Sequence, residues 1–522
     1  MRDFQKPGRS AVYADQGMCA TSHPLAAEAA ITLLRQGGSA VDAAIGAAIL
    51  LGMCEPQSTG IGGDMFALVA QPDGEILGLN ASGRAPAGLD ADAIRAGHET
   101  MPLYDVSAVT IPGAIDGFCK LHADHGRLPL DQVLAPAIHY AEAGVPVAPR
   151  VAHDYASSSH VLSGRARDYF LHDDAPLSVG ARFTAPGQAE VLRHVAAQGR
   201  AGFYEGDVAQ DMVDSLQALG GTHTLEDFAK TACTYVTPLR GTYRDAELIE
   251  LPPNGQGATA MLILNMLETM TPEADPVGVQ RLHLEAEATK LGYDARDRFL
   301  ADPDHATRLD HMVSKDTAKA LAGLIDADTA LPDPRAATDN IHKDTVYITV
   351  VDKDRQAVSL IYSIFHSFGS GFASDRFGIL FQNRGAGFTL EKGHPNEAGP
   401  GKRPLHTIIP GMLKLGDGSL MPFGVMGGSF QSTGHARFVS NVVDYGMDPQ
   451  AAIDAPRAFA EAGKLKVERG YGAEVRAALE AKGHTLMEDF PPIGGAQAIR
   501  IRPDGVLEGG SDPRKDGIAL GY

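Results

Sequence analysis

The sequence predicts an α+β protein in which layers of helices and sheets share one core. Three observations predict this class. Helical patterns dominate the chain up to residue 323, β-prone runs dominate the C-terminal third, and 44% of the 522 residues are hydrophobic. A chain of this length and hydrophobicity can bury a large core. Helix-rich and strand-rich segments that share such a core favour stacked layers over a string of separate domains.

The N-terminal part supplies the helices. Pro24 opens a helical pattern, and the pair Gly37-Gly38 ends it. Ser39 and Asp42 have the spacing of a capping box, which opens a second, alanine-rich helix. Farther along we expect a glycine turn and strand at 59–70, helices at 113–145 and through most of 148–230, a strand at "ELIELPP", a helix in "NGQGATAMLILNMLE" and another at 276–301.

The C-terminal part supplies the strands. Residues 323–344 are rich in Asp, Ala and Pro and show little periodicity, which predicts a linker. The change of character at this linker marks the main division of the chain. After it we expect strands at 345–351, 357–364, 377–381, 409–415 and 420–425, followed by helices at 432–445 and 449–459.

The two runs that follow the linker predict a hairpin. They are separated by "DKDRQ", and a turn centred on Asp354 places Thr345 directly opposite Ser363. On this fact alone, an ordinary threonine–serine cross-strand pair remains an open alternative. Thr345 gains a catalytic meaning if the bond to Asp344 is cut. The freed α-amine can then act as the base that a weak hydroxyl nucleophile needs.

The composition restricts the classes of partner. Net charge is −20, from 45 basic and 65 acidic residues, and no basic stripe is present, which argues against nucleic acid. The N-terminal stretch "MRDFQKPGRSAVYADQG" lacks an apolar signal segment. The longest near-apolar run, residues 40–53, is too short to cross a bilayer. We therefore expect a cytoplasmic protein with no membrane partner.

Several short patterns point only weakly to other kinds of site. The four cysteines are far apart and form no CxxC pair, so we expect neither a disulfide framework nor a zinc site. The run "GIGGD" at 60–64 lacks the third glycine of a dinucleotide-binding turn. The run "HADH" at 122–125 lacks a metalloprotease pattern and suits a solvated helix face. No metal and no cofactor are expected.

A series of motifs follows one order along nearly the whole chain. The motifs are "GMCATSHPLAAEAAITLLRQGGSAVDAAIGAAILLGMCEPQSTGIGGDMFALV", "VTIPGAIDGF", "LAPAIHYAEAGVPV", "GFYEGDVAQ", "PPNGQG", "EATKLGYDARDRFLADP", "PGKRPLHTIIP", "GVMGGSFQ" and "GGSDPRKDGIALGY". Each motif is weak alone, and the ordered set is specific. Taken together, the sequence resembles the gamma-glutamyltransferase family of N-terminal-nucleophile hydrolases.

This resemblance implies a proenzyme with an αββα fold, the four-layer sandwich of N-terminal-nucleophile hydrolases. The precursor would be cut between Asp344 and Thr345 into a large chain (1–344) and a small chain (345–522), which together form one structural unit. The expected partners are these two chains and a small-molecule amide that carries a carboxylate. A homodimer of processed heterodimers is left open.

The resemblance also assigns catalytic residues. Thr345 falls on the family nucleophile, and Ser363 falls on a hydroxyl residue that hydrogen-bonds the nucleophile. Gly427 and Gly428 fall on the glycine pair whose N–H groups resemble an oxyanion hole. For this pair, a plain turn between strand and helix remains the alternative.

Departures from the family pattern bear on the substrate. Glutamyl enzymes carry an acidic residue that holds the substrate amino group, whereas "FQNRGAGF" places Gly387 there, with Arg384 three residues earlier. A cation favours a carboxylate over an ammonium. Arg84 stands about two positions after the family's carboxylate-binding arginine, and His406 and Thr407 replace two serines that assist it. The alternatives are structural ion pairs for both arginines and a satisfied buried histidine for His406.

We therefore expect an enzyme that cuts its own chain and hydrolyses the amide of a small acid through a threonyl acyl-enzyme. Related branches act on oxamate-like, glutaryl-like or γ-glutamyl amides. Weak or no glutathione cleavage is predicted from Gly387 and Arg384. Two alternatives remain, namely a genuine gamma-glutamyltransferase or glutathione hydrolase, and an unprocessed, inactive binding homologue.

Overall fold

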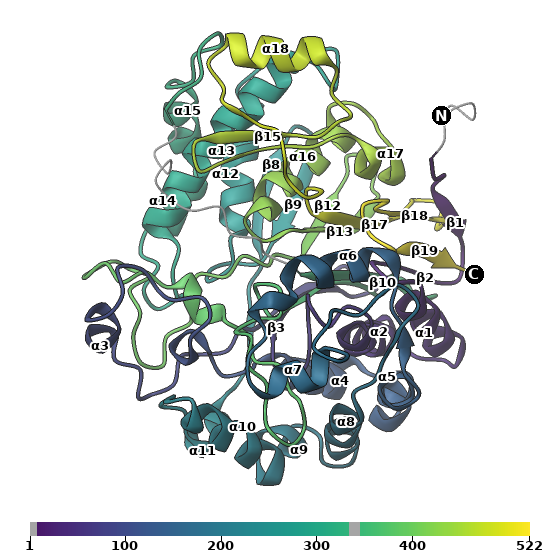
Figure 1. The fold of residues 1–522 in the computed structure, drawn as a ribbon. Coiled ribbons are helices and arrows are strands. Elements are labelled where there is room, and N and C mark those ends of the chain that lie inside the picture. The colour runs from purple at the N-terminus through teal and green to yellow at the C-terminus, as the bar shows by residue number, and fades with distance from the viewer. Residues whose placement is uncertain (1–7, 333–344) are drawn as a thin grey trace.

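The computed structural model describes residues 8–332 and 345–522. Two seven-stranded sheets lie face to face at the centre, and helices cover both outer faces (Figure 1). The layers therefore follow the order αββα. The prediction of an α+β sandwich is confirmed.

The first sheet combines strands from both ends of the chain with strands from its middle. All of its neighbouring strands are antiparallel. Its order is β1 (Val12–Ala14), β18 (Leu507–Ser511), β17 (Gly495–Ile501), β13 (Leu420–Met426), β12 (Gly411–Lys414), β9 (Ala246–Glu250) and β8 (Leu239–Tyr243).

The second sheet holds the predicted hairpin near its centre. It is also antiparallel throughout. Its order is β19 (Ile518–Gly521), β2 (Met18–Thr21), β10 (Val346–Val351), β11 (Ala357–Ser363), β3 (Asp64–Ala70), β4 (Ile76–Ala81) and β7 (Thr234–Val236). Smaller sheets join β14 (Ala458–Glu461), β15 (Lys464–Val467) and β16 (Leu486–Met487), and β5 (Val145–Pro146) with β6 (Arg182–Phe183).

The helices form two groups, one for each sheet. The group that packs with the second sheet comprises α1 (Pro24–Arg35), α2 (Ala40–Cys54), α4 (Ala114–His125), α5 (Leu130–Ala143), α6 (Pro149–Ser158), α7 (Arg165–Phe170), α8 (Pro186–Gln198), α9 (Ala201–Tyr204) and α10 (Gly206–Ala218). The group that packs with the first comprises α12 (Gly257–Glu268), α13 (Val279–Phe299), α14 (Leu309–Val313), α15 (Lys315–Ala322), α16 (Gln431–Val443) and α17 (Pro449–Asp454). Shorter helices at the periphery are α3 (Ala91–Arg95), α11 (Leu225–Lys230) and α18 (Ala473–Ala481).

The side chains of β10 alternate between two hydrophobic cores and so join the layers. Val346 and Ile348 belong to the core shared with the helices, whereas Tyr347 belongs to the core between the two sheets. Successive side chains of a strand point to opposite faces. Thr345 has the same parity as Tyr347, so the candidate nucleophile lies at the end of the layer between the sheets.

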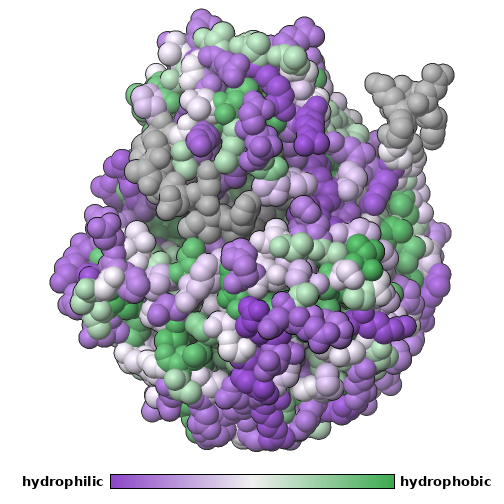
Figure 2. Space-filling view, viewed as in Figure 1, coloured by the Kyte–Doolittle hydropathy of each residue, from purple (hydrophilic) through white to green (hydrophobic). Residues whose placement is uncertain are grey.

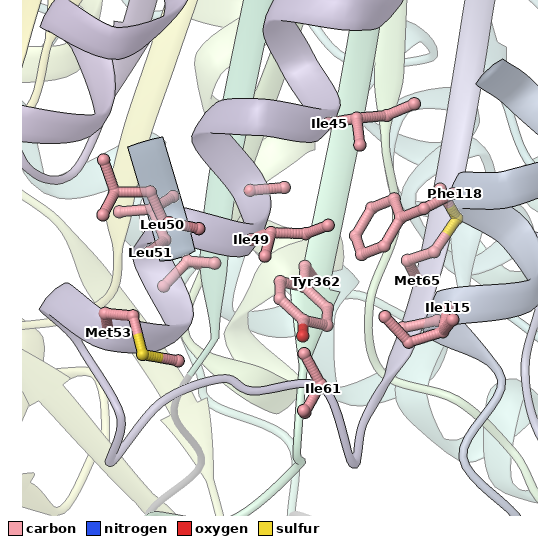
Figure 3. Close-up of a cluster of buried hydrophobic side chains, with 14 of the residues drawn as sticks. Ile45, Ile49, Leu50, Leu51, Met53, Ile61, Met65, Ile115, Phe118 and Tyr362 are labelled. Atoms are coloured by element: carbon pink, nitrogen blue, oxygen red, sulfur yellow. The ribbon is translucent and has the colours of Figure 1, made fainter. Parts of the chain in front are cut away.

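Helix α2 packs directly behind the hairpin. Figure 3 shows Ile45 and Ile49 of this helix beside Phe118 and Tyr362. The rings of Phe118 and Tyr362 meet edge to face with centroids 5.2 Å apart. The predicted capping box is present, because the Ser39 side chain accepts from the N–H of the third helical residue and that residue's carboxylate accepts in return.

Two predicted elements are wrong. The run 377–381 is buried but forms no strand, because Gly378 has a φ of +65° and the chain turns back on itself there. The helix expected over 449–459 ends at Asp454. Ala455 precedes Pro456, whose ring disfavours a helical conformation for the residue before it, and Ala455 has an extended ψ of 138°. Strand β14 starts shortly afterwards instead.

The surface of the molecule is mainly polar where Figure 2 shows it. On the face shown in Figure 2, hydrophilic residues predominate and hydrophobic ones are scattered in small groups. Across the described ranges, no helix combines the length and apolar character needed to cross a membrane.

Candidate active site

The hairpin brings Thr345 and Ser363 together. Residues 346–351 pair with 357–362 in the register expected from a turn centred on Asp354, so the predicted register is confirmed. The Thr345 hydroxyl lies 3.4 Å from the Ser363 hydroxyl and donates to it. Both side chains are buried.

Of the two residues that flank the predicted cut, the structure describes only the second. Asp344 lies outside the described residues, whereas Thr345 lies within them, directly before β10. Cutting at this bond, the nucleophilic role of Thr345 and the division into two chains stay predictions.

Ser363 accepts hydrogen bonds from two further donors. The backbone N–H of Phe365 donates to its Oγ at 2.8 Å, and Arg384 Nη2 donates at 3.2 Å. Phe365 has a φ of +82°, a conformation that is strained for a bulky residue. Such strain persists only where the surroundings enforce it, and it clusters at functional sites.

Arg384 is a fully buried cation beside these hydroxyls. Its Nη1 donates to Thr407 Oγ1 at 3.1 Å, and its guanidinium stacks 4.0 Å from the centre of the Phe365 ring. Among the described residues it forms no ion pair, and its Nε has no hydrogen-bond partner. Burial lowers the pKa of Arg384 to about 9, although the nearby charge of Asp64 opposes this shift. The guanidinium is therefore still charged at neutral pH.

His406 is buried and neutral. Its Nδ1 accepts from the backbone N–H of Ile408 at 3.3 Å, so Nε2 carries the proton and donates to Asp64 Oδ2 at 3.2 Å. Burial, followed by the charge of Arg384, lowers the pKa of His406 to about 3. This geometry is that of a satisfied buried histidine, the alternative left open by the sequence.

Asp64 is a site residue that the sequence reasoning missed. It pairs with Ser363 across β3 and β11. Its Oδ1 accepts from the backbone N–H groups of Gly83 and Gly113 and from Gln382 Nε2, at 2.9 to 3.1 Å. The signal was present as the acidic residue that ends the glycine turn "GIGGD". Asp64 holds three loops against the end of the hairpin.

The glycine pair lies between β13 and α16. Gly427 has a φ of +120° and Gly428 one of +58°, conformations that favour glycine. A Cβ at Gly427 would also lie 2.8 Å from the Cα of Gly494. Gly427 and Thr345 line the same cavity. The oxyanion-hole role of the pair stays a prediction.

A cavity of about 290 Å³ opens beside Thr345. Helix α6, the β14–β15 hairpin and the loop at 491–494 form its walls. Its lining residues include Thr345, Ser367, Gly427, Phe430, Phe459, Arg150, Asp154, Glu461, Lys466 and Lys515. Ser363 and Arg384 do not line it, so they lie one layer behind the candidate nucleophile.

The structure also places Arg84, one of the expected substrate-binding residues, and Gly387, the position where the glutamyl enzymes carry an acidic residue. Arg84 does not join the site: its side chain is 42% exposed and donates to Asp302 Oδ2 at 3.3 Å and to the Gly401 carbonyl at 2.9 Å. It is the structural ion pair that was left open. At Gly387, a Cβ would lie 2.5 Å from the Leu405 carbonyl oxygen. The backbone therefore leaves no room for the acidic side chain of the glutamyl enzymes.

One group in the described chain has the composition of a metal site. His283, Glu287 and His484 bring their ligand atoms within 4.8 Å of one another. His283 Nδ1 and His484 Nε2 are hydrogen-bonded to each other at 2.8 Å, and Lys290 Nζ already donates to Glu287 Oε1 at 2.7 Å. An ammonium on the same oxygen opposes a second cation. We assign these residues to packing between α13 and the segment around His484.

Comparison with known proteins identifies the family. The sequence matches the family described as Gamma-glutamyltranspeptidase over residues 26–522. The chain belongs to the gamma-glutamyltranspeptidase family. The resemblance drawn from the motifs is thereby confirmed, and it covers almost the whole chain.

Several known proteins are similar to this chain over nearly its full length. The chain is 34% identical to the glutathione hydrolase-like YwrD proenzyme of Bacillus subtilis, covering 97% of this chain and 98% of that protein. It is also 34% identical to the oxamate amidohydrolase proenzyme of Klebsiella pneumoniae, with the same coverage. The solved cephalosporin acylase from Bacillus halodurans superposes with a TM-score of 0.92 at 37% identity, covering 100% of this chain and 99% of that one. The chain therefore has the N-terminal-nucleophile fold and is a hydrolase of the gamma-glutamyltranspeptidase family.

Proposed function

We propose that this protein cuts its own chain before Thr345 and then hydrolyses amides whose acyl part carries a carboxylate. Thr345 Oγ attacks the amide carbon, and the freed α-amine of Thr345 takes the hydroxyl proton. The tetrahedral oxyanion forms beside the N–H groups of Gly427 and Gly428. The amine leaves with a proton, and water hydrolyses the threonyl ester to release the acid and regenerate the hydroxyl.

The surroundings of Arg384 are the main reason for proposing an acyl group that carries a carboxylate. It is a buried guanidinium with no carboxylate partner in the described chain, and only neutral hydroxyls accept its hydrogen bonds. A buried cation without an anion is costly, so such a site gains most when it binds one. One hydroxyl, that of Ser363, separates Arg384 from Thr345. A carboxylate on the acyl part of the substrate would supply the missing anion.

Two further points support the proposal. Position 387 has no room for a side chain, so it cannot hold the acidic group that binds a substrate α-amino group in the glutamyl enzymes. One relative is named as an oxamate amidohydrolase, and oxamate is an amide whose acyl part is a carboxylate-bearing acid. Several relatives are named as proenzymes, which supports a precursor that yields a large and a small chain.

A panel of 4-nitroanilides that share one leaving group tests the acyl preference. We expect oxalyl and succinyl anilides to be hydrolysed with higher kcat/KM than butyryl and γ-glutamyl anilides. In Arg384→Gln, kcat/KM for the acidic anilides should fall by roughly ten- to hundredfold, because a charge-assisted hydrogen bond contributes about 1.5–3 kcal/mol. The rate for butyryl anilide should change much less.

Arg84→Gln is the matched control, because this arginine is half exposed and paired with Asp302. It should leave the acyl preference unchanged. High γ-glutamyl turnover in the wild type would contradict the proposed acyl group. An equal loss for acidic and neutral anilides in Arg384→Gln would instead assign Arg384 to the support of Ser363 and Thr345.

A further inference from the structure

The cavity in front of Thr345 carries more positive than negative side chains. Arg150, Lys466 and Lys515 line it together with the carboxylates of Asp154 and Glu461. Neither Ser363 nor Arg384 lines this cavity. The part of the substrate that occupies this cavity is therefore a different part from the acyl carboxylate that Arg384 would bind.

Both carboxylates in the cavity are already paired with other cations. Arg150 Nε donates to Asp154 Oδ1 at 2.8 Å and to Oδ2 at 3.0 Å. Lys466 Nζ donates to Glu461 Oε2 at 2.8 Å. Of these three cations, Arg150 and Lys466 donate hydrogen bonds to the cavity's carboxylates, whereas the Lys515 side chain donates none to a described residue.

The Lys515 side chain is only 4% exposed, yet its ammonium donates no hydrogen bond to any described residue. Its nearest carboxylate oxygen, Asp154 Oδ2, is 4.0 Å away, too far for a hydrogen bond. The charge of Lys515 acts on Glu55, but the two side chains form no ion pair in the described chain. A nearly buried ammonium in this state has unused donors, and Lys515 belongs to the lining of the cavity.

The surrounding backbone fixes the position of this lysine. Its own N–H donates to the Asp512 carbonyl at 3.2 Å. Its stem passes over Gly495, where a Cβ would lie 2.8 Å from Lys515 Cγ. The absence of a side chain at Gly495 thus gives the lysine a channel toward the cavity.

We propose that Lys515 binds a carboxylate carried by the amine that leaves, so that the preferred substrates are amides of an amino acid or another carboxylate-bearing amine. This inference rests on the proposed function, because it assigns the two halves of the same amide substrate. The acyl half is bound toward Arg384, and the amine half extends from Thr345 into the cavity. The carboxylate of the amine would accept the free hydrogen bonds of the Lys515 ammonium.

Two amides that differ only in the leaving amine test this assignment. Both carry the acyl group that the wild type prefers; one leaving amine is 4-aminobenzoate and the other is its neutral analogue 4-aminobenzamide. We expect the ratio of kcat/KM, carboxylate over amide, to fall by about tenfold or more in Lys515→Gln. Lys515→Arg should keep most of the ratio, because it retains the charge.

Lys466→Gln is the matched control, since Lys466 lines the same cavity but is hydrogen-bonded to Glu461. Its ratio should stay within about twofold of the wild-type ratio. An unchanged ratio in Lys515→Gln, or an equal fall in both lysine variants, would overturn the assignment. Self-cutting and thermal unfolding of each variant show whether the protein is folded.

The two proposals fail in different ways. If the wild type hydrolyses neither amide, the proposed function fails. Calorimetric binding of 4-aminobenzoate and 4-aminobenzamide to the wild type and to Lys515→Gln then still tests the lysine. Tighter binding of the benzoate that is lost in Lys515→Gln supports the site, and equal binding of both compounds contradicts it.

Discussion

Three buried ionisable side chains, Arg384, Lys515 and Glu55, differ in how they are compensated. Arg384 has only hydroxyl partners, Lys515 has no hydrogen-bond partner in the described chain, and Glu55 is bonded to the Ser22 hydroxyl. Charges buried at this cost are typical of sites that bind or convert a charged ligand. Arg384 contacts Ser363, and Lys515 lines the same cavity as Thr345, so at the scale of residues the site contains two buried cations beside one hydroxyl pair.

Glu55 gives a pH-dependent prediction. Burial raises the pKa of Glu55 to about 7; Lys515 and the Ser22 hydrogen bond oppose the shift, and Asp154 and Asp516 add to it. The folded state thus holds a proton that the unfolded state releases near pH 4.5. The resulting stabilisation is complete below about pH 4.5 and is lost as the pH rises through 7, amounting to about 3 kcal/mol at most.

The measurement is the free energy of unfolding of wild type and Glu55→Gln between pH 5 and pH 8. Glutamine cannot ionise, so the stability of the variant relative to the wild type should increase across this range. A difference that stays constant with pH would contradict the raised pKa.

The site residues differ in how far the sequence alone could predict them. Thr345 and Ser363 followed from strand spacing, because a hairpin register is fixed by its turn. Arg384 was noticed because it departs from a family pattern. Asp64 and Lys515 were not assigned, since their roles depend on burial and on contacts between segments far apart in the chain.

At the scale of elements, β10 is held by its packing against the other sheet. The ring of Tyr347 lies over Gly424 of β13, and a Cβ there would lie 2.2 Å from a ring carbon. The Tyr347 hydroxyl is also hydrogen-bonded to Ser359 at 2.6 Å. This contact fixes the strand that begins one residue after Thr345.

Gly424→Ala should therefore destabilise the protein by about 1–3 kcal/mol, the usual cost of overpacking a core. Displacement of β10 should also slow self-cutting. Thermal unfolding and the rate of appearance of the small fragment measure the two effects. Gly97→Ala is the control, because a Cβ at Gly97 meets no atom within 4 Å. Equal stability of both variants would contradict the packing account.

The long helices and the hairpin were predictable from sequence, whereas several strands were not. The terminal strands β2 and β19 are four residues each and pair with segments from the other end of the chain. Such short strands carry little periodicity of their own. The helix expected over 449–459 was too long because the effect of Pro456 was overlooked.

At the scale of the whole molecule, the predicted cut would not separate two domains. The second sheet places β10 and β11 between β2 and β3, and the first sheet mixes β8 and β9 with β12 and β13. Each sheet therefore joins strands from before the cut with strands from after it. The two chains should therefore remain associated after cutting, as one unit that elutes as a single species in native buffer and separates only in denaturant.

The proposed reaction requires that the protein cut its own chain to free Thr345 as the nucleophile. The most direct measurement is the intact mass and N-terminal sequence of the fragments of natively purified wild type and Thr345→Ala. We expect a small fragment that begins Thr345-Val346-Tyr347 in the wild type and a single uncut chain in the variant. A fragment with a different start, or cutting of Thr345→Ala at the same bond, would contradict the proposal.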